Sequence, residues 1–159
     1  MEKSRNLYVL ADDEPGIMNR IAGIIARRAF NISGLTSGQG QSRHVQWIII
    51  GVEASEDDLE SLARPIRKLA GVRDVHELSA QGVARHMVLV QLSTPEVNEG
   101  SVAHIVSAYG ARIVKSDDTS VVIEMTGTDP EVEEFLDAVE QLPLMHVAVS
   151  GVVALPERE

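Results

Sequence analysis

The fold is decided by a short apolar stretch, Leu7-Tyr8-Val9-Leu10, and by the break that follows it, Asp12-Asp13-Glu14-Pro15-Gly16. The first stretch is typical of a strand, and the proline and glycine of the second end it. Isoleucines then recur with the spacing of one helix face, at Ile17, Ile21, Ile24 and Ile25. We therefore expect a helix from about residue 16 to residue 29.

Three further strands and one helix are expected before residue 79. Strands are predicted at 31–36 and 45–52, joined by a glycine-bearing loop that ends at Arg43, and at 72–78. The helix follows Ser55, whose spacing to Asp58 is that of a capping box. Because Pro65 has no backbone N–H to donate, we expect a kink or a break in this helix.

The same order of elements repeats in the second half of the chain. Leu7 and Met87, which begin the two halves, are 80 residues apart. Strands are predicted at 87–92, 112–114, 121–125 and 146–153. Helices are predicted around residues 102–109 and after an N-cap at Asp129, which precedes a proline. The sequence therefore predicts an α+β protein of two tandem ferredoxin-like (βαββαβ) domains, at 1–79 and 84–159.

The composition excludes several classes of function. Asp and Glu outnumber Lys and Arg by 24 to 14, and few residues are aromatic, so we expect no nucleic-acid-binding surface. Without cysteine there can be no disulfide, thiolate or iron–sulfur chemistry. The longest apolar run, at 47–50, is far shorter than the roughly 20 residues that cross a bilayer, and the N-terminus does not resemble a signal peptide. We expect a cytoplasmic protein that binds no membrane.

Each half is small for an independent domain. A chain of this size buries only about 60% of its extended surface, and this topology leaves a strand edge and one sheet face open. Pairing with a second copy is the usual remedy. We expect an obligate homodimer in which the N-terminal sheets or helices meet across a two-fold axis.

The turn at 12–16 is a candidate anion site. Gly16 lets a ligand approach the backbone closely, and the first N–H groups of the following helix point outward at its positive end. Such an end favours a carboxylate or a phosphate. The alternative is a tight strand-to-helix turn with no ligand.

Residues 12–21 and 27–32 resemble the opening of an ACT domain, a small amino-acid-sensing module. More narrowly, they resemble the regulatory small subunit of acetohydroxyacid synthase, also called acetolactate synthase. Matching stretches continue at 42–43, 66–69, 85–90 and 150–155, so the resemblance covers the chain from Leu7 to Leu155. It implies an ACT-type domain at 1–79 and the C-terminal domain of the small subunit at 84–159.

The resemblance also implies a function. Small subunits of this family are non-catalytic; they raise the activity of a catalytic large subunit and, in many members, confer feedback inhibition by valine, leucine or isoleucine in branched-chain amino-acid biosynthesis. Thiamine diphosphate, Mg and FAD then belong to the catalytic partner, and this chain has no cofactor of its own. A free-standing ACT-domain sensor of another pathway or of transcription is the alternative, and a small enzyme is a third.

In that family the effector lies between the N-terminal domains of a dimer. The resemblance therefore implies a site built from Asp13, Pro15, Gly16 and Ile17 of one chain, and from Asn31 and Ile32 of the other. The chain departs from the family at three positions. Asp13 stands where the family usually has asparagine, which can donate a hydrogen bond to a carboxylate, whereas an ionised aspartate only accepts. Ala29 replaces a glycine, and Pro65 interrupts a helix that the family leaves whole.

Other features are assigned no chemistry. The glycines at 34, 38 and 40 lack the lysine and the helix of a phosphate-binding loop, so a loop is expected there. The five histidines show no metal-ligand spacing, and His86 is more consistent with a partner contact than with catalysis. No catalytic arrangement of serine, histidine and acid can be nominated. The stretch at 85–90 and the C-terminal domain are candidate surfaces for the catalytic subunit.

Overall fold

The structure, a computed structural model, describes residues 3–78 and 82–156. These residues form two compact units, each described by itself. One unit holds the chain up to Val83 together with the residues from Val152 onward, and the other is Ala84–Gly151. The sequence instead places the last residues in the second domain, and the division at 79 and 84 stays a prediction.

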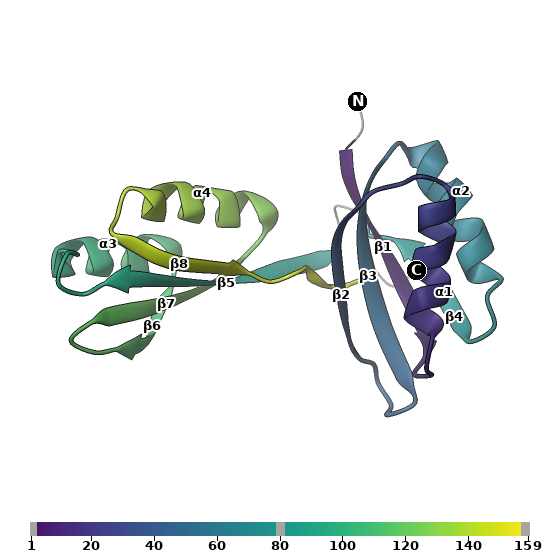
Figure 1. The fold of residues 1–159 in the computed structure, drawn as a ribbon, viewed down its shortest axis with the longest axis horizontal. Helices are drawn as coiled ribbons and strands as arrows, with labels where there is room; N and C mark the ends of the chain where they lie inside the picture. Colours follow the sequence, from purple (N-terminus) through teal and green to yellow (C-terminus); the bar gives the residue numbers. More distant parts are fainter. Residues whose placement is uncertain (1–2, 79–81, 157–159) are drawn as a thin grey trace. The chain divides into compact units, whose positions relative to one another are not determined.

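The first unit is a four-stranded antiparallel sheet with two helices. Its elements are β1 (Lys3–Asp12), α1 (Ile17–Arg27), β2 (Ile32–Gln39), β3 (Val45–Ala54), α2 (Glu56–Arg67) and β4 (Val72–Glu77). The strand order is β2-β3-β1-β4, so β2 and β4 are the edges. Both helices lie on one face of the sheet (Figure 1).

The second unit repeats this arrangement. Its elements are β5 (Val83–Ser93), α3 (Glu99–Tyr109), β6 (Arg112–Ser116), β7 (Ser120–Gly127), α4 (Asp129–Glu140) and β8 (Leu144–Val149). The strand order is β6-β7-β5-β8. A short strand, β9 (Val153–Leu155), follows in the chain and belongs to the first unit. Figure 1 shows α3 and α4 on one face of this sheet. The predicted α+β class with two ferredoxin-like units is confirmed.

Each unit has its own apolar core between helices and sheet. In the first, the alternating residues Leu7, Val9 and Ala11 of β1 are buried, and they pack with the isoleucines of α1. In the second, Phe135 is fully buried and meets Tyr109 edge to face, with ring centroids 5.5 Å apart. In the described part of the chain, no helix is long and apolar enough to span a membrane.

Several local predictions are confirmed and others are wrong. Ser55 caps α2 as predicted, its Oγ accepting from the Asp58 N–H at 3.2 Å. Pro65 does not break α2, because it lies in the last turn and the helix ends two residues later. The N-cap of α4 is Thr128 rather than Asp129, and it forms a capping box with Glu131.

Two strand predictions are also corrected. The segment 37–39, predicted as loop, belongs to β2. The predicted last strand at 146–153 is two strands, since β8 ends at Val149 and β9 begins at Val153. Between them Ser150 donates its N–H to the Met87 carbonyl at 2.9 Å.

Candidate functional site

The backbone of the turn between β1 and α1 is open on one side at Gly16. Gly16 is the N-cap of α1, and its φ of 85° lies in the left-handed region that favours glycine. A Cβ at this position would meet nothing within 4 Å, so the space beside the backbone is open. The α1 helix has no side-chain cap and no acidic residue in its first turn.

The first N–H groups of α1 are available to a ligand. The Ile17 N–H reaches the Glu14 carbonyl at 3.4 Å, and the Arg20 N–H donates to Gly16 at 3.0 Å. In the described parts of the chain, the N–H groups of Met18 and Asn19 have no protein acceptor. Together with the positive end of the helix dipole, these donors suit a carboxylate.

The acidic residues of the turn are in different environments. Asp12 forms an ion pair with Arg73 at 2.6 Å, and Glu14 is paired with Arg20. Glu14 also lies against Gly71, where an added Cβ would come within 2.5 Å of its Oε1. Among the described residues, no hydrogen bond or ion pair engages the carboxylate of Asp13. Asp13 is therefore the acid of this turn that can receive a ligand's ammonium group.

A depression of about 460 Å³ opens beside Asp13. Its other lining residues come from the ends of β2 and β3 and from the turn between them: Ser37, Gly38, Gln39, Arg43 and Gln46. Gln46 donates to the Asp12 carbonyl at 3.3 Å, which ties β3 to the turn. The Trp47 ring lies against Gly38, where it leaves no room for a Cβ.

Sequence reasoning missed four polar residues of this depression: Ser37, Gln39, Arg43 and Gln46. The sequence predicts a loop between residue 36 and Arg43, and a loop does not fix which way its side chains point. The family resemblance at Ser42-Arg43 was the available sequence signal for this region. The position of these residues beside Asp13 depends on the pairing of Gln39 with Gln46, which brings this end of the sheet to the turn.

Asn31 and Ile32 lie at the opposite end of the same sheet. Ile32 pairs with Val52, which in turn pairs with Arg5 near the start of β1. The turn follows Asp12, whose partner on β3 is Val45. Val45 and Val52 are seven positions apart, which spans about 23 Å of strand. One chain therefore cannot bring Asn31 and the turn to one small ligand.

The predicted site residues thus fall into two groups. Asp13, Pro15 and Gly16 share the exposed turn with the backbone of Ile17, whose side chain is 2% exposed and belongs to the core. Asn31 is exposed at the start of β2, and Ile32 beside it is half-buried.

The second unit joins two of the stretches that carried the resemblance. His86 approaches the Ser150 carbonyl through Nδ1 at 3.0 Å and the Asp129 carboxylate through Nε2 at 2.5 Å. The Met87 N–H donates to the Ser150 Oγ at 2.9 Å. These contacts hold the start of β5, the end of β8 and the start of α4 together. Within the described residues, no three His, Asp or Glu side chains converge as a metal site.

Comparisons with known proteins agree along the chain. Residues 7–74 match the family described as AHAS small subunit-like ACT domain. Residues 85–158 match the family described as small subunit of acetolactate synthase. A probable acetolactate synthase small subunit of Archaeoglobus fulgidus is 31% identical over 94% of each chain. The acetolactate synthase small subunit of Mycolicibacterium smegmatis is 28% identical over 96% of this chain and 90% of that protein.

The fold agrees with a solved structure. The crystal structure of the acetolactate synthase small subunit from Thermotoga maritima matches with a TM-score of 0.86 and 24% identity, over 99% of both chains. Together with the sequence relationship over nearly the whole length, this places the chain in the family of acetolactate synthase small subunits.

Proposed function

We propose that this regulatory subunit activates an acetolactate synthase catalytic subunit and makes it sensitive to a branched-chain amino acid. The effector would bind between two copies of the chain, at the β1–α1 turn of one and the start of β2 of the other. The observation that carries the proposal is the separation of Asn31 from the turn by the length of the sheet. A second copy removes that separation.

The free edge of β2 supports this pairing. Its eight residues, ISGLTSGQ, carry no charge, and Leu35 is 49% exposed. The other edge strand, β4, carries Arg73, Asp74 and Glu77. Charges on an edge strand discourage pairing with another chain, so β2 is the edge open to it.

Antiparallel pairing of β2 with its own copy has a direct geometric consequence. When the strand is centred on itself, Ile32 of one copy lies beside Gln39 of the other. Gln39 borders the depression that also contains Asp13. The same two-fold axis that closes the sheet would therefore bring Asn31 of one chain to the turn of the other.

The donors and acceptors of this composite site fit a zwitterionic amino acid. The N–H groups of Met18 and Asn19 would meet the carboxylate, and Asp13 would accept from the ammonium group. Ile32 would offer apolar contact to an aliphatic side chain. This polarity is consistent with aspartate at position 13, because the acid then faces the cationic end of the ligand.

Regulation would follow from linkage. An amino acid that binds one arrangement of the dimer better than another shifts how the dimer engages its partner, and the partner shifts the affinity for the amino acid equally. The chemistry would stay with the catalytic subunit, which would hold thiamine diphosphate, magnesium and FAD, while this chain would need no cofactor.

Reconstitution tests the proposal. The catalytic subunit of the same organism is assayed alone, with this chain, and with this chain plus valine, leucine or isoleucine. We expect the rate to rise on adding the chain and to fall again with at least one of the three amino acids. No complex and no change in rate would instead favour a free-standing sensor, and turnover by this chain alone would indicate an enzyme.

Calorimetric titration then tests the site. We expect heat from at least one of the three amino acids with the parent protein, and at least tenfold weaker binding in Asn31→Ala. Asp118→Asn removes an exposed acid from the turn between β6 and β7 and should bind as the parent does. Binding only in Asp13→Asn would show that the aspartate excludes the effector, and silence in both would refute the site.

A further inference from the structure

Two opposite charges line the depression at the β1–α1 turn without pairing with each other. Asp13 comes from the turn itself, and Arg43 comes from the connection between β2 and β3. In the described parts of the chain, no hydrogen bond or ion pair engages the guanidinium group of Arg43, and the same holds for the carboxylate of Asp13. One depression therefore carries a cation and an anion, and both are available to a ligand.

The other charges beside this turn are already paired. Asp12 forms an ion pair with Arg73 at 2.6 Å, and Glu14 is paired with Arg20. The rest of the lining of the depression is uncharged: Ser37, Gly38, Gln39 and Gln46. The lining therefore carries one positive and one negative charge, and the polar groups around them are amides and a hydroxyl.

Backbone hydrogen bonds hold the connection that carries Arg43 against the turn. The Val45 N–H donates to the Ser42 carbonyl at 3.1 Å, which closes the backbone around Arg43. The Asp13 N–H donates to the His44 carbonyl at 3.0 Å. The residue next to Arg43 is thus tied directly to Asp13, so the two charges stand on backbone segments that are held together.

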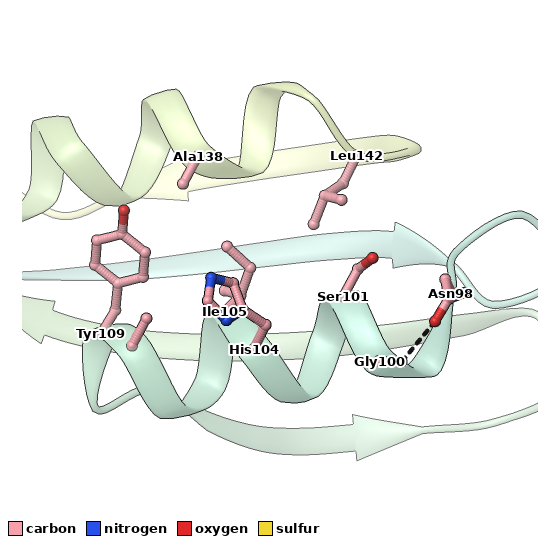
Figure 2. Close-up of a pocket in the computed structure, with 9 residues that line it drawn as sticks. Asn98, Gly100, Ser101, His104, Ile105, Tyr109, Ala138 and Leu142 are labelled. Carbon is pink, nitrogen blue, oxygen red and sulfur yellow. Dashed lines mark hydrogen bonds between the residues drawn. The ribbon is translucent and has the colours of Figure 1, made fainter.

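Two other cavities do not offer this combination. Figure 2 shows a cavity of about 510 Å³ between α3 and α4. Among the described residues that line it there is no Asp, Glu, Lys or Arg, and Asn98 already accepts from the Gly100 N–H at 2.7 Å. A cavity of about 270 Å³ beside α2 is lined by Arg67, but this arginine is paired with Glu60 at 2.9 Å.

The two charges select a small zwitterion as the occupant. A nucleotide would bring several negative charges toward Asp13, which would repel them. A metal ion would meet the positive charge of Arg43, and no three acids or histidines converge in the described parts of the chain. A free amino acid carries its ammonium group and its carboxylate on one carbon atom, so it can satisfy both residues at once.

We propose that Arg43 is a specificity-determining residue of the effector site and binds the carboxylate of the amino acid whose ammonium group Asp13 receives. This inference rests on the proposed function, because it takes the effector as the ligand. The N–H groups of Met18 and Asn19 can share the same carboxylate, since its two oxygens offer about four lone-pair sites. The guanidinium group also offsets the repulsion between Asp13 and this carboxylate.

Ligands without the carboxylate separate this role from a structural one. The full-length parent, Arg43→Gln and Arg43→Lys are titrated calorimetrically at neutral pH with valine, leucine and isoleucine, and with the amide of each. The amides keep the ammonium group and the side chain and lose the negative charge. We expect the parent to bind an amino acid at least tenfold more tightly than its amide, and Arg43→Gln to bind that amino acid at least tenfold more weakly than the parent. Arg43→Lys keeps the charge but not the planar fork, and should recover part of the loss.

A matched control removes the same charge elsewhere. Arg64→Gln lies on α2, outside the lining of the depression, at a side chain that is 74% exposed. It should bind the amino acid within twofold of the parent. Circular dichroism and sedimentation check that each variant keeps the secondary structure and the oligomeric state of the parent. Without amino acid, Arg43→Gln should bind the purified catalytic subunit within twofold of the parent.

The outcomes separate this inference from the proposed function. If the parent binds an amino acid and Arg43→Gln binds it equally well, Arg43 is not part of the site and the proposed function stands. Equal affinity of the parent for an amino acid and its amide, or equal losses for both in Arg43→Gln, overturns the carboxylate contact. A loss of affinity for the catalytic subunit alone would assign Arg43 to the partner surface instead. If the parent binds none of the three amino acids, the effector site and this inference fall together, while reconstitution tests activation separately.

Discussion

Ala29 adopts a backbone conformation that costs an L-residue free energy. Its φ of 59° places it in the left-handed region, just after the C-cap of α1, where glycine is the usual residue. The Ala29 N–H donates to the Ala26 carbonyl at 3.0 Å, so the hydrogen bonding of the helix end fixes this geometry. The departure from the family at this position is therefore a strained one.

Replacing Ala29 by glycine should stabilise the protein. Relief of the left-handed strain exceeds the entropy that glycine adds to the unfolded chain, so we expect Ala29→Gly to raise the free energy of unfolding by about 0.5–1 kcal/mol. Urea denaturation measures the change. Ala103→Gly, at an exposed position within α3, should lower the free energy by about as much. Equal effects of the two substitutions would contradict the assignment of strain.

Asp117 organises the turn between β6 and β7. Its carboxylate accepts from the N–H groups of Thr119 and Ser120 at 3.0 and 2.9 Å, and from the Thr119 hydroxyl at 2.6 Å. These hydrogen bonds, foremost those from Thr119, hold the pKa of Asp117 well below its usual range. Of the two adjacent acids in this turn, Asp117 and Asp118, it is therefore Asp117 that organises the backbone.

The lowered pKa makes this turn sensitive to acid. A group with a depressed folded-state pKa contributes stability above its unfolded pKa of about 3.9 and loses it as the pH falls toward the folded value. We expect Asp117→Ala to lower the melting temperature at pH 7, and the difference from the parent to shrink below pH 4. A difference that stays constant from pH 7 to pH 2 would show that charge is not involved.

At the scale of residues, the sequence predicted a helix N-cap correctly where only one residue could serve as the cap. Ser55 was the only cap candidate next to its acidic turn, and it caps α2. At α4 the sequence predicts the N-cap at Asp129, before a proline, and this prediction is wrong by one residue, since Thr128 is the N-cap. The reciprocal hydrogen bonds between Thr128 and Glu131 decide it, and they are visible only in three dimensions.

At the scale of elements, periodicity identified the helices and strands but placed some ends wrongly. β2 continues through Gly38 because Trp47 packs over the missing side chain, a contact between strands that local sequence does not reveal. Pro65 is tolerated because α2 ends within a turn of it. Both misjudgements came from treating glycine and proline by their local preferences alone.

The open edge of β2 yields a prediction about assembly. Leu35 lies near the centre of β2, and in the pairing that sets Ile32 beside Gln39 it lies beside Thr36 of the other copy. Leu35→Lys would place a charge on each of the two paired edges, and we expect the dimer to dissociate into folded monomers at micromolar concentration. Analytical ultracentrifugation measures the state.

The control for this prediction lies on the other edge of the same sheet. His76→Lys introduces a lysine at an exposed position of β4 and should leave the dimer intact. If Leu35→Lys stays dimeric, the two copies meet through another surface, and the composite effector site would have to be abandoned with the β2 pairing.

At the scale of the whole molecule, the repeat of strand and helix patterns was enough to predict two ferredoxin-like units, because each pattern is local. The candidate site could be predicted only in part. The turn at Gly16 is a local signal, and its left-handed φ agrees with the reason for a glycine there. The distance between the turn and Asn31 depends on sheet register, which local sequence does not reveal.

Mixing two defective variants tests the central claim, a site built from two chains. Asp13→Arg damages the turn and Asn31→Ala damages the partner's contribution, so each homodimer should bind the amino acid that the parent binds at least tenfold more weakly. When the two are unfolded together and refolded, half of the molecules are expected to be mixed dimers with one intact site. The account predicts that binding returns, at about one site for every two dimers. If the mixture binds no better than the two variants do separately, or if either variant alone binds as the parent does, the site is not shared between chains.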